Sequence, residues 1–193
     1  MAVEKGIIEL FGEVVKSAGE NLDDVKVVTP DGPTAIKFDH LNYIFGNSSY
    51  IKEKLDEYSK SAVTDYLQVP MVCLLCPVNE NRGKDREIKT DAKVNIIIAC
   101  STTREYSNEE RLVYSFQNIL RPIYRHILDA LRKHTRFNVA YDGEIQHTYS
   151  ENYSYGRFGA YTSTGEKLSE PIDAIDVRDL ELTVNNKQNC RQL

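Results

Sequence analysis

The sequence predicts a single α+β domain, in which a mixed or antiparallel sheet carries a long kinked helix on one face. Three observations support this fold class. Two apolar runs, residues 69–76 and 94–100, are short, continuous and partly β-branched, as is typical of buried central strands. Residues 107–133 carry apolar side chains at steps of three and four, which is helical spacing. Residues 172–184 alternate between apolar and polar like a final strand.

The composition fits one globular domain. Of the 193 residues, 41% are apolar and 27% charged, so a core can form; we assign it to residues 1–184, followed by a polar tail at 185–193. A net charge of -5 and a pI near 5.5 predict no general affinity for polyanions. The sequence contains neither an apolar run that could span a bilayer nor a signal peptide, so we expect no membrane partner.

The first third of the chain predicts two helices and two short strands. Residues 2–17 have the pattern of an amphipathic N-terminal helix. Strand candidates at 25–28 and 35–38 flank a turn-rich stretch, and a second helix begins after residues 47–49. This second helix presents three apolar side chains on one face: Ile51, Leu55 and Tyr58.

The long helix has a well-defined start and an internal irregularity. Ser107 and Glu110 form a capping box, in which each side chain bonds to the backbone N–H of the other residue. Pro122 lies within the apolar pattern, where it removes one helical hydrogen bond and clashes with the carbonyl of Asn118. Because the apolar phase continues past the proline, we expect one helix to about residue 133, kinked near 118–121.

The final strand changes its alternation in the middle. Ile175 and Val177 share one phase, whereas Leu180, Leu182 and Val184 share the opposite one. Without a correction, the change would turn the buried face toward solvent. The sequence therefore predicts a β-bulge at residues 178–179.

Two polar segments lack the composition of a core. Residues 77–93 mix four acids with five bases and predict an exposed loop or a projecting hairpin arm; residues 136–163 combine a strand candidate at 136–141 with a tyrosine-rich excursion at 141–163. Tyrosine is frequent at protein interfaces, although it can also stack on bases. We interpret both segments as subunit or partner interfaces, with these candidate residues: Arg82, Lys84, Asp85, Arg86, Glu87, Tyr149, Tyr153 and Tyr155.

The sequence suggests no catalytic, metal or cofactor site. Cys73 and Cys76 resemble a CxxC motif, but residues three apart on a strand point to opposite faces, so we interpret them as small buried hydrophobic residues. The four histidines are scattered, and no phosphate-binding loop or nucleophile elbow occurs. Asp173, Asp176 and Asp179 likewise share no strand face before the bulge. We therefore expect a protein that is not an enzyme and needs no cofactor.

A basic cluster at residues 121–136 leaves two interpretations open. Cations near the end of a helix are stabilised by the helix dipole, which is the simpler account. The alternative is a nucleic-acid-binding accessory protein whose phosphate- or DNA-facing residues are Arg121, Arg125, Arg132 and Lys133.

The order of several segments resembles that of a known group of proteins. The segments are NYIFG from Asn42, VPMVCLL from Val69, VNIIIACST from Val94, YSNEERLVYSF from Tyr106, ILRPIY from Ile119 and IDAIDVRDLEL from Ile172. Together they resemble the tail-completion or tail-terminator-like neck (connector) ring proteins of tailed phages of Bacteroidales, including crAss-like phages. The likeness covers about residues 42–184, but not the 77–93 and 141–161 segments.

The resemblance implies a structural role in a virion. Such subunits form homo-oligomeric rings, six- or twelve-fold, between the portal and the tail, and they are assembled in the cytoplasm of the bacterial host. Portal, neighbouring ring and tail proteins would be the partners. Double-stranded DNA would pass through the channel without sequence-specific binding, which an acidic chain would favour.

Overall fold

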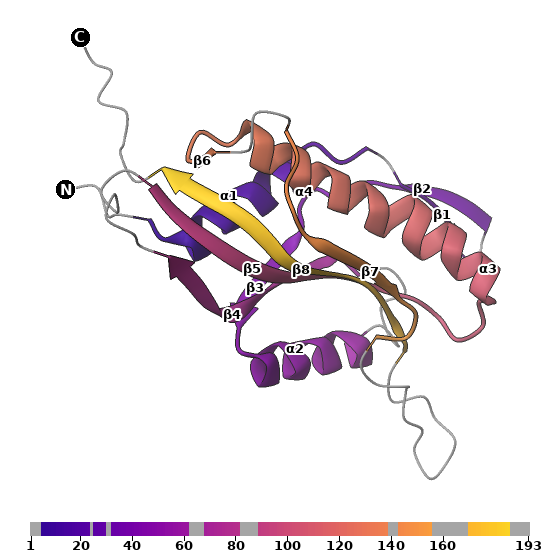
Figure 1. Cartoon of the computed structure of the whole chain (residues 1–193). Coiled ribbons are helices and arrows are strands. Elements are labelled where there is room, and N and C mark those ends of the chain that lie inside the picture. Colours follow the sequence, from indigo (N-terminus) through magenta and orange to yellow (C-terminus); the bar gives the residue numbers. More distant parts are fainter. Residues whose placement is uncertain are drawn as a thin grey trace.

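The computed structural model describes residues 5–23, 25–29, 32–61, 68–81, 89–138, 143–155 and 170–185. Its centre is a six-stranded mixed sheet, so the predicted α+β class is confirmed (Figure 1). The strand order is β3-β4-β5-β8-β6, and β7 also pairs with β8. The strands are β3 (Asn42–Gly46), β4 (Met71–Asn81), β5 (Lys89–Ser101), β6 (Phe137–Asn138), β7 (Thr148–Asn152) and β8 (Ile172–Asn185).

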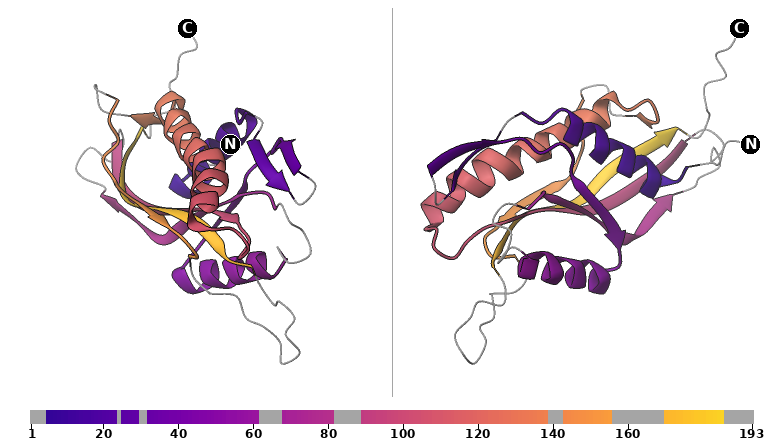
Figure 2. Two further views of the ribbon diagram at one scale, coloured as in Figure 1. Left: turned by 90° about the vertical axis from the view of Figure 1, so that its right-hand side faces the viewer. Right: turned by 180° about the vertical axis from the view of Figure 1, so that it is seen from behind.

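Helices lie on both sides of this sheet. The N-terminal helix α1 (Ile7–Glu20) and the long helix of residues 108–133 cover one face, and α2 (Ser48–Ser61) lies against the other (Figures 1 and 2). A separate hairpin of β1 (Val25–Thr29) and β2 (Gly32–Ile36) lies beside the long helix. We call the face under α1 and the long helix the helix face, and its reverse the α2 face.

The long helix begins as predicted. The Ser107 hydroxyl accepts from the Glu110 N–H at 3.2 Å, and the Glu110 carboxylate accepts from the Ser107 N–H at 2.7 Å, which confirms the capping box. The helix runs as α3 (Asn108–Arg111), a π-helical segment η1 (Leu112–Leu120) and α4 (Arg121–Lys133). The π-helical register ends at Leu120, two residues before Pro122, and the Arg121 N–H donates to the carbonyl of Phe116. The kink stays a prediction.

The predicted bulge is present in β8. Val94 pairs with Leu180 and Ile96 with Val177, so two residues of β8, Arg178 and Asp179, face the single residue Asn95 of β5. Asp179 adopts a φ of 52°, and its N–H donates to Asn95 Oδ1 at 2.9 Å. The extra residue keeps the apolar side chains on the helix face on both sides of the bulge.

Two segments expected to leave the domain are partly strands of the sheet. β4 and β5 continue into the 77–93 segment and pair there, Asn79 with Lys93 and Asn81 with Asp91. Within the tyrosine-rich excursion, β7 pairs with β8 over five residues. Tyr149 and Glu151 are two residues apart and both point toward the helices, as residues of one strand face do. The polar composition of the segment concealed this strand pattern. Residues 82–88, 156–163 and the tail beyond 185 lie outside the described residues, and so do all five charged interface candidates of the arm.

The core is unequal on the two faces. On the helix face, buried side chains from α1, η1, α4 and four strands form one continuous cluster, with Phe11 and Phe116 fully buried. On the α2 face, a smaller cluster under α2 includes Ile51, Cys73 and Ile97. The remainder of that face carries polar side chains.

Candidate subunit interface and polar sheet face

An aromatic group lines β7, the last strand on one side of the sheet. The rings of Tyr124 on α4 and Tyr149 on β7 lie 4.9 Å apart, and the Tyr124 hydroxyl is 2.6 Å from Nε2 of His147. Tyr149 is nevertheless 37% exposed. Tyrosine, whose ring can pack on one side while its other side meets solvent, is enriched at protein interfaces.

The same strand is tied to α4 by an ion pair. Arg121 donates from Nε and Nη2 to the two carboxylate oxygens of Glu151, at 2.7 and 3.0 Å. These bonds, chiefly, hold the pKa of Glu151 below its usual range. Burial, reinforced by a hydrogen bond to Glu151, raises the pKa of Tyr149. Tyr149, Glu151 and Arg121 thus form one fixed polar group on the sheet edge.

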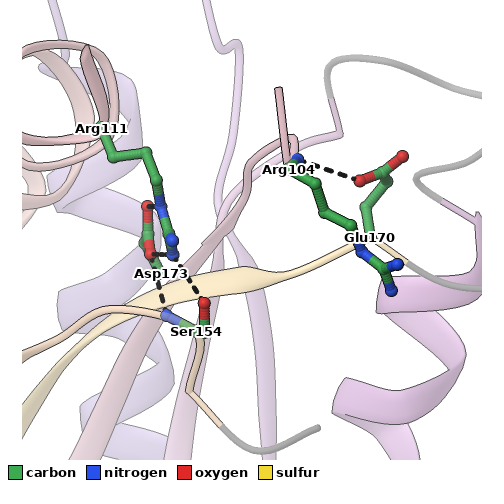
Figure 3. A network of polar contacts seen from close by, with 5 residues as sticks. All are labelled: Arg104, Arg111, Ser154, Glu170 and Asp173. Carbon is green, nitrogen blue, oxygen red and sulfur yellow. Dashed lines mark hydrogen bonds and ion pairs between the residues drawn. The ribbon is translucent and has the colours of Figure 1, made fainter. Parts of the chain in front are cut away.

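A buried ion pair holds the end of this edge (Figure 3). Arg111 on α3 binds the carboxylate of Asp173 on β8 through both Nε and Nη2, and Asp173 is fully buried. The Ser154 hydroxyl accepts from Arg111 at 3.1 Å, while the Ser154 N–H donates to Asp173 at 3.1 Å. Ser154 has a φ of 55°, which brings its backbone into the turn that follows β7. Asp173 is therefore a structural anchor, which its spacing in the sequence did not indicate.

The two other tyrosine candidates have different environments. Tyr153 is 39% exposed, and its ring packs against that of Phe116 in a tilted arrangement with the ring centres 4.6 Å apart; the Arg111 guanidinium lies 5.4 Å from the Tyr153 ring centre. Tyr155 is half-buried and lines a hollow of about 420 Å³ between α2 and the sheet. Tyr149 and Tyr153 are thus available on the surface beside β7, whereas Tyr155 faces the other side of the molecule.

Two of the four candidate phosphate-binding residues in the basic cluster are paired with protein groups. Arg121 binds Glu151, and Arg132 donates to Asp129 at 2.8 Å and to the carbonyl of Gly143 at 2.9 Å. Arg125 and Lys133 are exposed and form no ion pair within the described residues. Half of the candidate phosphate-binding charges are therefore already compensated.

On the α2 face, the part of the sheet beyond α2 forms an acid-rich groove of about 650 Å³. Among the described lining residues Lys93 is the one base, and it is paired with Glu181 at 2.7 Å. The described lining contains five acidic residues: Glu80, Asp91, Glu144, Asp179 and Glu181. The described lining therefore carries net negative charge, together with asparagine, glutamine and threonine side chains and some apolar surface from residues such as Ile145 and Leu182.

The opposite edge of the sheet is β3, which sequence analysis did not assign as a strand. Tyr43 packs on Phe11 of α1 and donates from its hydroxyl to the carbonyl of Ile8 at 2.9 Å. Phe45, two residues on, is 50% exposed although it is a large apolar residue in a strand. The edge at β3 thus resembles the edge at β7 in presenting an exposed aromatic ring.

The cysteines behave as small apolar residues. Cys73 belongs to the core under α2 and Cys100 to the core of the helix face, so the sheet lies between them. Cys73, Cys76 and Cys100 are all free, and burial raises the pKa of the Cys73 thiol to about 12. Among the described residues, no group of three or more histidine, cysteine or acidic side chains is placed to hold a metal ion.

Sequence reasoning missed the partners of the interface candidates. The sequence did not identify the contacts made by Glu151, Tyr124 and His147, because these contacts join positions about 20 to 30 residues apart. The alternation of Tyr149 and Glu151 was the available signal for β7.

No helix in the described part of the chain has the length and hydropathy needed to cross a membrane.

Comparison with models of known families and with curated proteins gives no match. A function for this chain therefore has to rest on the geometry above and on the segment resemblance.

Proposed function

We propose that the chain is a structural, non-catalytic subunit of a ring in the neck of a tailed bacteriophage. The ring would lie between the portal and the tail, continue the DNA channel and join the neighbouring components. Six or twelve copies would close it. The order of segments from residue 42 to residue 184 supports this assignment, because it resembles that of such ring proteins.

The observation that carries the proposal is an open sheet with two different, exposed aromatic edges. One edge, at β3, presents Phe45, and the other, at β7, presents Tyr149. A surface that binds a different surface of the next copy generates a ring when the rotation closes. If a surface instead bound the same surface of a second copy, assembly would end with a dimer.

The acid-rich groove supports a channel that DNA passes through. Carboxylates repel phosphates, so a lumen lined by Asp91, Glu144 and Glu181 would not retain the duplex. Nucleic-acid binding through the 121–136 cluster finds less support, because Arg121 and Arg132 are neutralised by carboxylates.

Negative-stain microscopy and light scattering of the purified chain test the proposal. We expect rings with a central opening, formed by the chain alone or when portal or tail partners are added. A strictly monomeric chain that binds neither partner would overturn the proposal.

A gel-shift titration separates this function from the alternative. We expect no shift of duplex DNA at low salt. Salt-dependent binding that is lost in the Arg125→Ala, Arg132→Ala double variant, but kept in a Lys60→Ala control on α2, would favour the nucleic-acid-binding accessory protein instead.

A further inference from the structure

Two edge strands of the sheet, β3 and β7, lack the usual protection against pairing. Within the described residues, no strand pairs with the outer side of β3 or of β7. Edge strands commonly carry lysine, proline or a bulge that prevents pairing with another chain. Neither NYIFG nor TYSEN contains lysine or proline, and the single charge, Glu151, is bound by Arg121. Each strand is five residues long, so their lengths match.

The strand directions are also complementary. β3 is parallel to β4, and each following neighbour, β4 to β5, β5 to β8 and β8 to β7, is antiparallel. β3 and β7 of one molecule therefore run in opposite directions. When two copies lie side by side with their sheets in the same orientation, β7 of one copy meets β3 of the next antiparallel.

The exposed aromatic rings of the two edges lie on the same face. Phe45 pairs with Leu74 and Tyr149 with Val177, and both partners belong to the core of the helix face. Because the side chains of paired residues point to the same face, Phe45 and Tyr149 both point to the helix face. In a continuous sheet they would meet across the junction and cover each other from water.

We propose that successive copies of this chain join by antiparallel pairing of β7 with β3 of the next copy, with Tyr149 opposite Phe45 and Glu151 opposite Tyr43. The pairing makes one sheet continuous around the assembly, with its acid-rich part on a single side. Main-chain hydrogen bonds supply the affinity and the aromatic pair selects the register. This inference rests on the proposed ring function and specifies the contact that closes the ring.

Disulfide cross-linking of the full-length chain tests the pairing. Cys76 and Cys190 are first replaced by serine, leaving the buried Cys73 and Cys100. In this background, the Phe45→Cys, Tyr149→Cys double variant is expected to give, under mild oxidation, a ladder of covalent oligomers that ends at the size of the closed ring. Three strands separate the two positions within one copy, a distance of about 19 Å, so a bond inside one molecule is excluded by its geometry.

Matched variants control for face and for symmetry. Ser150 lies between Tyr149 and Glu151 and points to the other face, so Phe45→Cys with Ser150→Cys should not cross-link. Ile44→Cys with Ser150→Cys restores the match on that other face and should cross-link; this pair also serves if loss of Tyr149 impairs folding. Each single variant should stay uncrosslinked, and a covalent dimer from one of them would overturn the head-to-tail pairing.

The outcomes distinguish the inference from the function on which it rests. Rings seen by microscopy without a ladder from either matched pair would retain the ring function and overturn the β7–β3 contact. A cross-link from Phe45→Cys to a portal or tail protein would assign the β3 edge to that partner and overturn self-pairing. Monomers that bind no partner would overturn both proposals.

Discussion

Two arginine–carboxylate pairs connect the long helix to the edge of the sheet, and they differ mainly in burial. Arg111 and Asp173 have side chains that are 9% and 0% exposed, whereas those of Arg121 and Glu151 are 33% and 20% exposed. In both pairs the guanidinium contacts both carboxylate oxygens. The two pairs thus have similar geometry but lie in different dielectric environments. Access to water therefore sets how much each pair contributes to the free energy of unfolding.

The largest expected effect comes from removing the buried cation. Arg111→Met leaves the Asp173 carboxylate without its cation in a site that is buried from solvent. The substitution also removes the hydrogen bond from Arg111 to the Ser154 hydroxyl. We expect the free energy of unfolding to fall by about 3–5 kcal/mol, measured by urea denaturation at pH 7.

A double variant identifies the cause of that loss. Arg111→Met with Asp173→Leu removes both charges and should recover most of the lost stability, because no buried charge is left unpaired. A loss of less than about 1 kcal/mol in the single variant would mean that burial does not control this pair.

The second pair should weigh less. Arg121→Met removes the guanidinium from a carboxylate that water still reaches, so we expect the free energy of unfolding to fall by about 1 kcal/mol. A double-mutant cycle with Glu151→Gln measures the coupling itself. Equal losses for Arg111→Met and Arg121→Met would contradict the comparison.

The pH dependence of the second pair follows from the lowered pKa of Glu151. Because the folded-state pKa lies below that of the unfolded chain, the contribution is complete above the ordinary glutamate value and is lost as the pH falls through the folded value. The difference in unfolding free energy between wild type and Glu151→Gln should therefore shrink as the pH falls from about 5 to about 3. A difference that is constant over this range would show that the carboxylate charge is not its source.

The smallest effect on stability is expected for an ion pair in the acid-rich groove. Lys93 and Glu181 lie 2.7 Å apart, but their side chains are 62% and 50% exposed. Lys93→Met should leave the urea midpoint unchanged at physiological salt, because water and ions screen the pair. A clear shift of the midpoint would indicate that the groove is less accessible to solvent than its side chains suggest.

How far the sequence predicts the fold depends on whether a signal is local. The capping box at Ser107 and Glu110 and the bulge at Arg178 and Asp179 were both predictable, because each is a pattern within a few residues. The strand β7 was not predicted as such, because Tyr149 and Glu151 alternate within a polar segment. The π-helical register before Pro122 was likewise not predicted, although the proline marked the place.

The candidate site divides in the same way. Tyrosine enrichment marked Tyr149 and Tyr153 as interface candidates; both are exposed beside β7, and their role in an interface stays a prediction. The basic cluster looked like an unbroken set of charges, yet Arg121 is bound by a carboxylate 30 residues away. Distance in the sequence hides such pairs, because the fold alone brings β7 against α4.

By itself, the sequence determined the α+β class, the long helix from its cap to about residue 133, the two central strands and the bulge. These features follow from side-chain periodicity and from hydrogen bonds between neighbouring residues. Only the tertiary structure decided that β3 and β7 become opposite edges of one sheet, that Phe45 and Tyr149 share a face, and that Asp173 is buried against Arg111. Strand order and the burial of a charged residue such as Asp173 arise from contacts between distant segments, which no local pattern encodes.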